Sequence, residues 1–192
     1  WKRAKWGALG QKFLKFGERI IGKHANEIIV LNDPMKLYFK ETYNRATHVI
    51  PNGVEIPQIL EPEMIKEKWG LEKESYILFL GRLVPEKGVH YLIEAYNKLD
   101  TDKKLVIAGG SSHSDDYVEQ LAAMSIDKSN IIMTGFVSGK ILEELYSNAY
   151  LYVLPSDVEG LPISLLEAMS YRRCCLVSDI KENTTTCLDK GF

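Results

Sequence analysis

Residues 76–88 read Tyr-Ile-Leu-Phe-Leu-Gly-Arg-Leu-Val-Pro-Glu-Lys-Gly, an apolar run followed at once by a turn with two glycines and two cations. A short, continuous apolar run bounded by turn residues is typical of a strand that is buried on both faces. We expect a strand at 76–80 and a helix near 88–99, with the polar turn between them. A buried strand that leads into a helix in this way is the repeating unit of a parallel α/β sheet.

The same alternation continues along the chain. Further buried strands are expected at 105–108, 131–133, 150–154 and 174–177, and amphipathic helices near 115–124, 139–148 and 161–171. The pattern predicts an α/β fold with a Rossmann-like, doubly wound parallel sheet. Because ligands bind at the carboxyl ends of the strands in such sheets, function is expected in the loops that follow them. These loops begin after Leu80, Ala108, Met133 and Leu154.

The first 50 residues follow a different plan. Short strands are expected at 27–31 and 47–50, with a helix from 33 to about 43 that begins with a cap and a proline. The next segment, Pro51-Asn-Gly-Val-Glu-Ile-Pro57, reads as a linker. We therefore expect one domain at 1–50, a linker at 51–58 and a second domain at 59–192. The chain begins with Trp1, so we expect it to be part of a longer protein whose second domain is cut before its last helix.

The charge of the chain is nearly balanced overall but not locally. With 24 Lys and Arg against 26 Asp and Glu, the net charge is −2, which excludes a disordered chain and a globally basic nucleic-acid binder. Residues 1–23, however, carry seven cations against one anion, a local charge of +6. In this basic segment an apolar stripe has helical spacing: Trp6, Leu9, Phe13, Phe16 and Ile20. Either it belongs to a domain helix with a solvated basic face, or it docks on anionic lipid or on a phosphate-bearing acceptor.

The three cysteines do not form a metal or disulfide pattern. Cys174 and Cys175 are adjacent, and Cys187 lies near the end of the chain. This is neither a zinc spacing nor an even disulfide framework, so we expect buried or inert thiols in a reducing cytosol.

The turn after the first strand of the sheet is suited to an anion. Gly81 and Gly88 bracket Arg82 and Lys87 at the start of a helix. Free backbone amides and the helix dipole attract an anion there, and the two cations add a guanidinium fork and a point charge. A diphosphate fits this pattern; the alternative is a solvated turn with incidental charges.

A second segment, after the strand at 150–154, carries two carboxylates. It reads Glu159-Gly-Leu-Pro-Ile-Ser-Leu-Leu-Glu-Ala-Met169. Glu159 is expected in the loop and Glu167 in the following helix, so one ligand along the helix start could meet both. A carboxylate is a natural acceptor for paired sugar or ribose hydroxyls, and a lone buried Glu would be costly without a partner. The alternative is a capped surface helix.

The two motifs, in this order, resemble those of a known family. Gly-Arg-x(4)-Lys-Gly followed by Glu-Gly-Leu-Pro-Ile-x(3)-Glu-Ala-Met is similar to the pattern of glycosyltransferase family 4, the retaining group 1 transferases of GT-B fold. Ile50–Val54 and Val177–Ile180 also resemble habitual segments of the family. The first seven residues, Trp1–Gly7, further resemble those of bacterial rhamnosyl- and galactosyltransferase-like enzymes that build capsule or other cell-surface polysaccharide. The resemblance implies that 59–192 is the C-terminal, donor-binding domain of a GT-B enzyme.

The resemblance also implies roles for individual residues. Arg82 and Lys87 would bind the donor's diphosphate and stabilise it as it leaves, and Glu159 would lie by the donor sugar; these three are the expected catalytic residues. Glu167 would hold the ribose hydroxyls, while the loop at 135–137 would border the base. The full set of expected donor-binding residues is Gly81, Arg82, Lys87, Phe136, Val137, Glu159, Gly160, Leu161, Pro162, Ile163 and Glu167.

The implied reaction moves a sugar, with retention, from a UDP-, dTDP- or GDP-sugar to a glycan or lipid-linked acceptor. Departure of a nucleoside diphosphate develops negative charge, which two cations and oriented amides stabilise, so no metal or other cofactor is expected. No nucleic-acid partner is expected. The expected location is the cytoplasm, with peripheral contact to the inner face of the plasma membrane through residues 1–23.

The chain departs from the family pattern in two places, and three alternative functions stay open. Arg172-Arg173 stands where family members have a glycine that ends the helix in a left-handed turn. Residues 1–50 resemble only the tail of an acceptor domain, so the isolated chain is expected to be inactive. The alternatives are a nicotinamide-dependent oxidoreductase, disfavoured because no strand is followed by Gly-x-Gly-x-x-Gly, a nucleotide-sugar epimerase on the same fold, and a noncatalytic membrane-docking or binding module.

Overall fold

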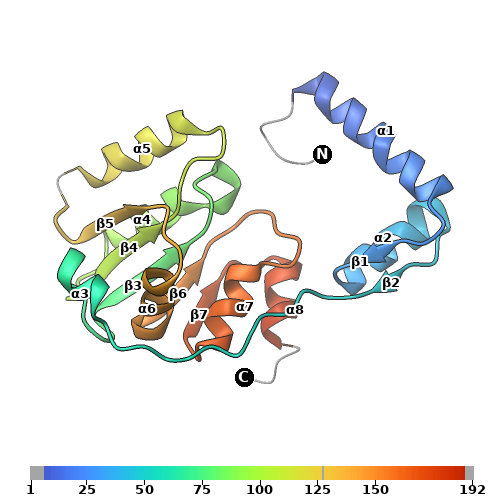
Figure 1. Cartoon of the computed structure of the whole chain (residues 1–192). Helices are drawn as coiled ribbons and strands as arrows, with labels where there is room; N and C mark the ends of the chain where they lie inside the picture. The colour runs from blue at the N-terminus through green and yellow to red at the C-terminus, as the bar shows by residue number, and fades with distance from the viewer. Residues whose placement is uncertain (1–6, 127, 189–192) are drawn as a thin grey trace.

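The computed structural model describes residues 7–126 and 128–188, so the expectations for Trp1, Trp6 and the last residues to Phe192 lie outside it. Figure 1 shows the order of the elements along the chain. The first part contains α1 (Ala8–His24), β1 (Ile29–Val30), α2 (Asp33–Tyr43) and β2 (His48–Val49). The second contains α3 (Met64–Trp69), β3 (Tyr76–Leu80), the 3-10 helix η1 (Pro85–Lys87), α4 (Val89–Tyr96), β4 (Lys104–Ala108), α5 (Asp115–Ser125), β5 (Ile131–Gly135), α6 (Lys140–Asn148), β6 (Leu151–Leu154), α7 (Ile163–Ser170), β7 (Cys174–Val177) and α8 (Lys181–Leu188).

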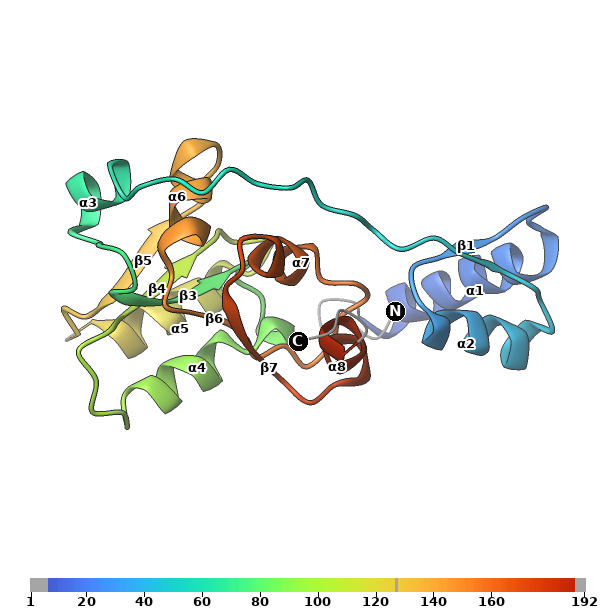
Figure 2. The same cartoon turned by 90° about the horizontal axis from the view of Figure 1, so that it is seen from below.

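The second part is built on a parallel sheet with the order β5-β4-β3-β6-β7. The chain moves outward from β3 to β5 and then returns to place β6 beside β3, where Leu78 pairs with Tyr152. The connecting helices α4 and α5 lie on one face of the sheet, and α6 and α7 lie on the other (Figure 2). This confirms the predicted doubly wound fold. Its direction of winding reverses between β3 and β6, which is where such sheets bind their ligands.

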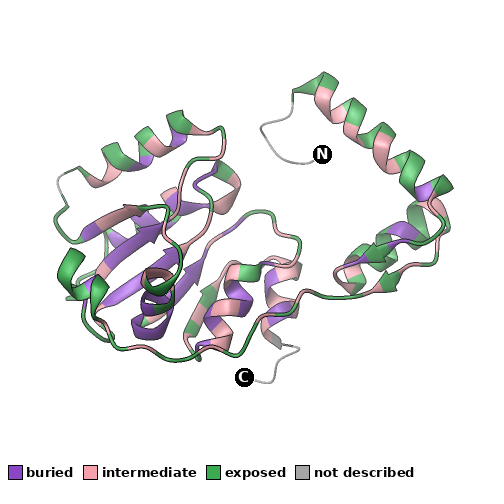
Figure 3. Ribbon diagram, in the orientation of Figure 1, coloured by how far each residue is buried: buried purple, intermediate pink, exposed green. Residues whose placement is uncertain are grey.

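The core of this part lies between the sheet and its helices. Figure 3 shows β3, β4 and β6 largely buried, as the continuous apolar runs predict. The largest fully buried side chains include Tyr76, Tyr146 and Tyr152, whose hydroxyl groups all donate hydrogen bonds inside the core. Three buried hydroxyls with partners fix how α6 and α7 sit on the sheet, because an unpaired buried hydroxyl would be costly.

Residues 7–50, called the head from here on, form a smaller unit. Strands β1 and β2 form a parallel pair, and Ile28, Val30 and Phe39 make a separate small core. Helix α2 begins as predicted: the Asn32 side chain accepts a hydrogen bond from the Met35 amide at 2.9 Å, and Pro34 stands in the first turn. Between Val49 and Met64 the chain forms no helix or strand. The division of the chain at 51–58 stays a prediction.

The apolar stripe of the first helix faces solvent. Leu9 is 84% exposed, Phe13 75% and Phe16 61%, whereas Gly22 is buried against the ring of Tyr43. The helix therefore packs on α2 near its end and leaves the predicted stripe uncovered in this structure. None of the described helices has the length and the hydropathy that a bilayer crossing needs.

The boundaries of several predicted helices are corrected. The helix expected at 161–171 runs from Ile163 to Ser170, and that expected near 88–99 ends at Tyr96. Helices α3 and α8 had no counterpart among the predicted elements, because neither carries a long apolar periodicity. Of the three cysteines, which were expected to be buried or inert, Cys174 is exposed on the edge strand β7, whereas burial raises the pKa of Cys175 to about 12.

The C-terminal end of α7 keeps its left-handed turn although Arg172-Arg173 replaces the glycine of the family pattern. Arg172 has a φ of +58°, so the left-handed turn is kept although no glycine occupies it. The Arg172 amide donates to the Met169 carbonyl at 2.9 Å and the Arg173 amide to the Ala168 carbonyl at 3.0 Å. These are the two hydrogen bonds of a Schellman cap. The cap is therefore made with a residue that is strained in it.

Candidate functional site

The loop after β3 is held against the segment that follows β6. Gly88 has a φ of +68°, and a Cβ at this position would lie 2.1 Å from the carbonyl oxygen of Pro155. Only glycine permits this approach. Two residues before Gly88 and two residues after Pro155, the Asp157 amide donates to the Glu86 carbonyl at 2.9 Å. The two predicted motifs therefore meet at the point where the sheet reverses its winding.

Lys87 and Glu159 form an ion pair across this junction. The Nζ–Oε1 distance is 2.5 Å, and the two side chains are only 13% and 8% exposed. A pair so buried is costly to break from one side, because the remaining charge is left without a partner. The sequence predicted a role for both residues against a ligand, but nothing in their spacing of 72 positions indicated that they touch.

Arg82 lies over a separate, open cavity at the carboxyl edge of the sheet. The cavity measures about 540 Å³, and its walls include Gly81, Arg82, Phe136 and Val137 together with the glycine- and serine-rich loop at 109–112. Arg82 is exposed, and its guanidinium has no hydrogen-bond partner among the described residues. Four of the predicted site residues thus line one cavity, with a free cation at its edge.

The start of α7 is fixed by two buried tyrosines. Tyr152 donates to the Ser164 hydroxyl at 2.9 Å and also contacts the Leu80 carbonyl at 3.3 Å. Tyr146 contacts the Ser164 carbonyl at 3.2 Å. The first turn of α7 is therefore tied to the end of β3, next to the cation-bearing loop. Burial raises the pKa of both phenols well above their ordinary value, so they stay protonated donors.

The predicted residues Gly160 to Ile163 lead into this helix at the same edge. Pro162 is the N-cap of α7. The amides of Leu161 and Ile163, on either side of it, therefore have no carbonyl acceptor within the helix. The dipole of α7 adds a partial positive charge there. In the chain these residues directly follow Glu159, which is paired with Lys87.

Glu167 is placed differently from the other predicted residues. Tyr146 donates to its Oε2 at 2.8 Å, which supplies the partner that a partly buried carboxylate needs. Glu167 and Ile163 line a cavity of about 520 Å³ whose opposite wall is the linker at 53–58. The structure therefore does not bring Glu167 into the cavity that contains Arg82. Among the described residues, no three His, Cys, Asp or Glu side chains gather as metal ligands do.

Comparison with known proteins agrees with these observations. The family of glycosyl transferases, group 1, matches residues 62–190, and a domain family of unknown function, DUF1972, matches residues 1–55. The UDP-Gal:alpha-D-GlcNAc-diphosphoundecaprenol alpha-1,3-galactosyltransferase of Escherichia coli is 30% identical over 190 residues, which cover 92% of this chain and 48% of that protein. The O-antigen chain mannosyltransferase RfbU of Salmonella typhimurium is 29% identical, with 88% of this chain and 46% of that protein covered. The chain therefore spans about half the length of these relatives.

The fold is shared with solved structures. HepE of Anabaena, determined in complex with UDP and glucose, superimposes with a TM-score of 0.80 at 19% identity, over 91% of this chain and half (50%) of that one. At this identity the likeness concerns the fold, which is the GT-B fold of its neighbours. With the family match over residues 62–190, the reversal of winding at β3 and β6, and both motifs at that point, the chain belongs to the group 1 family of glycosyl transferases.

Proposed function

We propose that this chain is the donor-binding half of a retaining glycosyltransferase of bacterial polysaccharide biosynthesis, such as that of capsule. The enzyme would move a sugar from a nucleoside-diphosphate sugar to a glycan or lipid-linked acceptor in the cytoplasm. The observation that carries the proposal is that Arg82, the Lys87–Glu159 pair and the start of α7 all follow β3 or β6 at the edge where the sheet reverses its winding. The names of two relatives support it. The name of the Escherichia coli enzyme gives a UDP-Gal donor and a diphosphoundecaprenol-linked acceptor, and the name of the Salmonella typhimurium enzyme gives the O-antigen chain.

In the proposed mechanism the donor's diphosphate lies between Arg82 and Lys87. As the bond to the sugar breaks, negative charge grows on the leaving phosphate, and both cations stabilise it. Glu159 orients the Lys87 ammonium through the 2.5 Å contact and borders the donor sugar. The amides around Pro162 add oriented dipoles, so the charge is stabilised by the chain itself and the proposal requires no metal.

The nucleoside part has two candidate contacts. Phe136 is 81% exposed on the wall of the 540 Å³ cavity and offers a ring edge or face to a base, next to Val137. Glu167 is the proposed acceptor for ribose hydroxyls, with Oε2 held by Tyr146 and Oε1 left for the ligand. Because Glu167 lies in another cavity, this contact needs the donor to reach along the first turn of α7 or the carboxylate to turn.

We propose UDP as the first nucleotide to test, with dTDP and GDP as alternatives, because HepE was determined with UDP and one relative is named for UDP-Gal. Thermal unfolding of the chain should be followed with each diphosphate at about 100 times its Kd. The expected rise in Tm is about 5–10 °C for the correct one. If none of the three raises Tm, and NAD does, the donor-site proposal is wrong and the oxidoreductase alternative is favoured.

A sugar epimerase on the same fold would bind the same diphosphates. Product analysis of the full-length protein separates the two reactions: the transferase releases a nucleoside diphosphate and a glycosylated acceptor, whereas an epimerase returns a new nucleotide sugar. Recovery of all the sugar on the nucleotide would contradict transfer.

A second candidate role, docking to the inner face of the plasma membrane, is favoured by α1. Its apolar residues Leu9, Phe13 and Phe16 are exposed beside Lys12 and Arg19, a combination that suits an anionic headgroup layer. Co-sedimentation with vesicles that contain anionic lipid should fall when Phe13 and Phe16 are both changed to Ser, with no change in Tm because both are exposed. Equal binding of the variant, or no binding to anionic vesicles, would contradict membrane docking. The second result would favour cover of this face by the rest of a longer protein.

A further inference from the structure

The loop between β6 and α7 is fixed at three points. Its start is held by the Asp157 amide on the Glu86 carbonyl, and its middle by Glu159 on Lys87. Both anchors belong to the same sheet domain. The third does not: the Asn32 side chain, from the head, donates from Nδ2 to the carbonyl oxygen of Gly160 at 2.9 Å. Among the described residues, it is the one hydrogen bond between residues 7–50 and residues 62–188.

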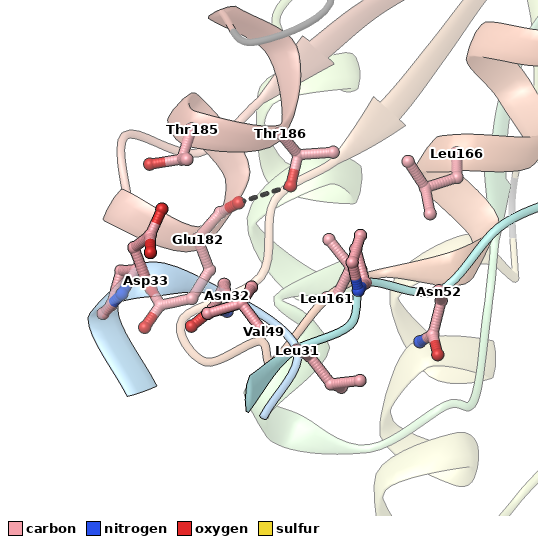
Figure 4. A pocket seen from close by; sticks show the side chains of 12 residues that line it. Leu31, Asn32, Asp33, Val49, Asn52, Leu161, Leu166, Glu182, Thr185 and Thr186 are labelled. Atoms are coloured by element: carbon pink, nitrogen blue, oxygen red, sulfur yellow. Dashed lines mark hydrogen bonds between the residues drawn. The ribbon is translucent and has the colours of Figure 1, made fainter. Parts of the chain in front are cut away.

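Asn32 uses both ends of its amide. Oδ1 accepts from the Met35 amide at 2.9 Å and caps α2, while Nδ2 is left to point at Gly160. The cap thus fixes the side chain in the orientation that reaches the loop. Figure 4 shows Asn32 on the wall of a cavity of about 240 Å³, with Leu31 and Val49 from the head and Leu161 and Leu166 from the other side.

Gly160 has few other restraints. It is exposed, and a Cβ at this position would meet no atom within 4 Å, so packing does not hold its peptide in place. The Asn32 hydrogen bond therefore decides where the Gly160 carbonyl points, and with it the orientation of the amide of Leu161. Glu159 precedes this peptide directly, so its carboxylate is also affected.

We propose that Asn32 is a positioning residue: by holding the Gly160 carbonyl it sets the Glu159 carboxylate and the amides at the start of α7 for the donor. This rests on the proposed function of that loop. It makes the head a determinant of donor affinity, and coupling between two sites is reciprocal. Donor binding should in turn stabilise the start of α2.

The test separates the two hydrogen bonds of Asn32. Asn32→Ser and Asn32→Asp both keep a good cap for α2, but serine is too short to reach Gly160 and aspartate places an acceptor against an acceptor. Asn32→Ala loses both bonds. In the 192-residue chain we expect UDP, measured by calorimetry, to bind about three- to tenfold more weakly to all three variants, as loss of one hydrogen bond implies. The urea midpoint should fall for Asn32→Ala alone. UDP affinity equal to wild type in Asn32→Ser would overturn the proposal and leave Asn32 as a cap.

Hydrogen exchange tests the contact with and without nucleotide. Without ligand, amides at 157–161 should exchange faster in Asn32→Ser than in wild type, while those of β3 and β4 are unchanged. With UDP, amides at 33–40 should be protected in wild type and not in Asn32→Ser, while those at 81–88 are protected in both. Unchanged exchange at 157–161 would refute the positioning role, whatever UDP does. If wild type binds no UDP yet the ligand-free difference is seen, the contact stands and the proposed function fails.

Discussion

The close contact of Gly88 with Pro155 makes Gly88→Ala the sharpest test of the site's construction. An alanine there must adopt a φ of +68°, which costs about 1–2 kcal/mol for an L-residue. Its Cβ would also lie 2.1 Å from the Pro155 carbonyl oxygen, more than 1 Å inside ordinary van der Waals contact. Forcing such an overlap costs roughly 1–3 kcal/mol because backbone must move. The expected loss of stability is about 2–5 kcal/mol.

Gly70→Ala is the matched control. Gly70 has a φ of +61°, and a Cβ there would meet only the Lys104 Nζ, at 3.7 Å. It therefore carries the conformational cost without the overlap. Urea unfolding of the two variants should differ by about 1–3 kcal/mol, with Gly88→Ala the less stable. Gly88→Ala should also weaken UDP binding, since the loop that carries Lys87 is displaced, and Gly70→Ala should not. Equal unfolding free energies would refute the close approach of the two loops.

Three further outcomes are expected. Arg172→Gly should raise the free energy of unfolding by about 1 kcal/mol in urea, because glycine removes the strain of φ +58° while the Schellman hydrogen bonds remain; a loss of stability would show that the Arg172 side chain stabilises the cap. Tyr152→Phe should cost about 1–2 kcal/mol, because the Ser164 hydroxyl loses the donor that the buried Tyr152 supplies, and an unchanged urea midpoint would contradict this. Burial raises the pKa of Tyr146 above its ordinary value near 10, so the unfolded chain loses this proton above about pH 10 while the folded chain keeps it. The urea midpoint should then fall as pH rises beyond 10, and the same slope in Tyr146→Phe would remove Tyr146 as its cause.

The sheet was predictable because each of its strands contains a short continuous apolar run, and the central strands β3, β4 and β6 are largely buried. The runs at 76–80 and 174–177 coincide with β3 and β7, and the others differ by one or two residues at their ends. Continuous apolar runs carry this information locally. Helix ends were less well predicted, since they depend on which carbonyls find partners: α4 stops at Tyr96, and beyond it the Lys98 and Leu99 amides donate only three residues back, to the Ala95 and Tyr96 carbonyls at 3.0 Å.

The location of the site followed from the topology, but its internal contacts did not. Both motifs follow strands that the winding rule brings together, so a contact between the segments that carry Lys87 and Glu159 was predictable at this edge of the sheet. The ion pair between Lys87 and Glu159, 72 positions apart, depends on the approach at Gly88, which is a tertiary contact.

Glu167 and Asn32 show the same limit. The partner of Glu167 is a phenol on α6, and the partner of Asn32 is a carbonyl 128 positions away. Asn32 was identified in the sequence only as a helix cap. An amide that caps a helix with its oxygen leaves its NH₂ group free to donate, and that was the one available signal.

We propose that the chain binds a nucleoside diphosphate through Arg82 and Lys87, where the sheet reverses its winding between β3 and β6. Arg82 gives the most direct test, because it is exposed and its loss leaves no buried charge behind, unlike loss of Lys87. Calorimetry should compare UDP binding to wild type, Arg82→Ala and the control Lys98→Ala, which removes an exposed cation beyond the far end of α4. The expected result is binding at least about tenfold weaker in Arg82→Ala, as loss of a charged hydrogen bond implies, with wild-type affinity in Lys98→Ala. Wild-type affinity in both variants would contradict the claim.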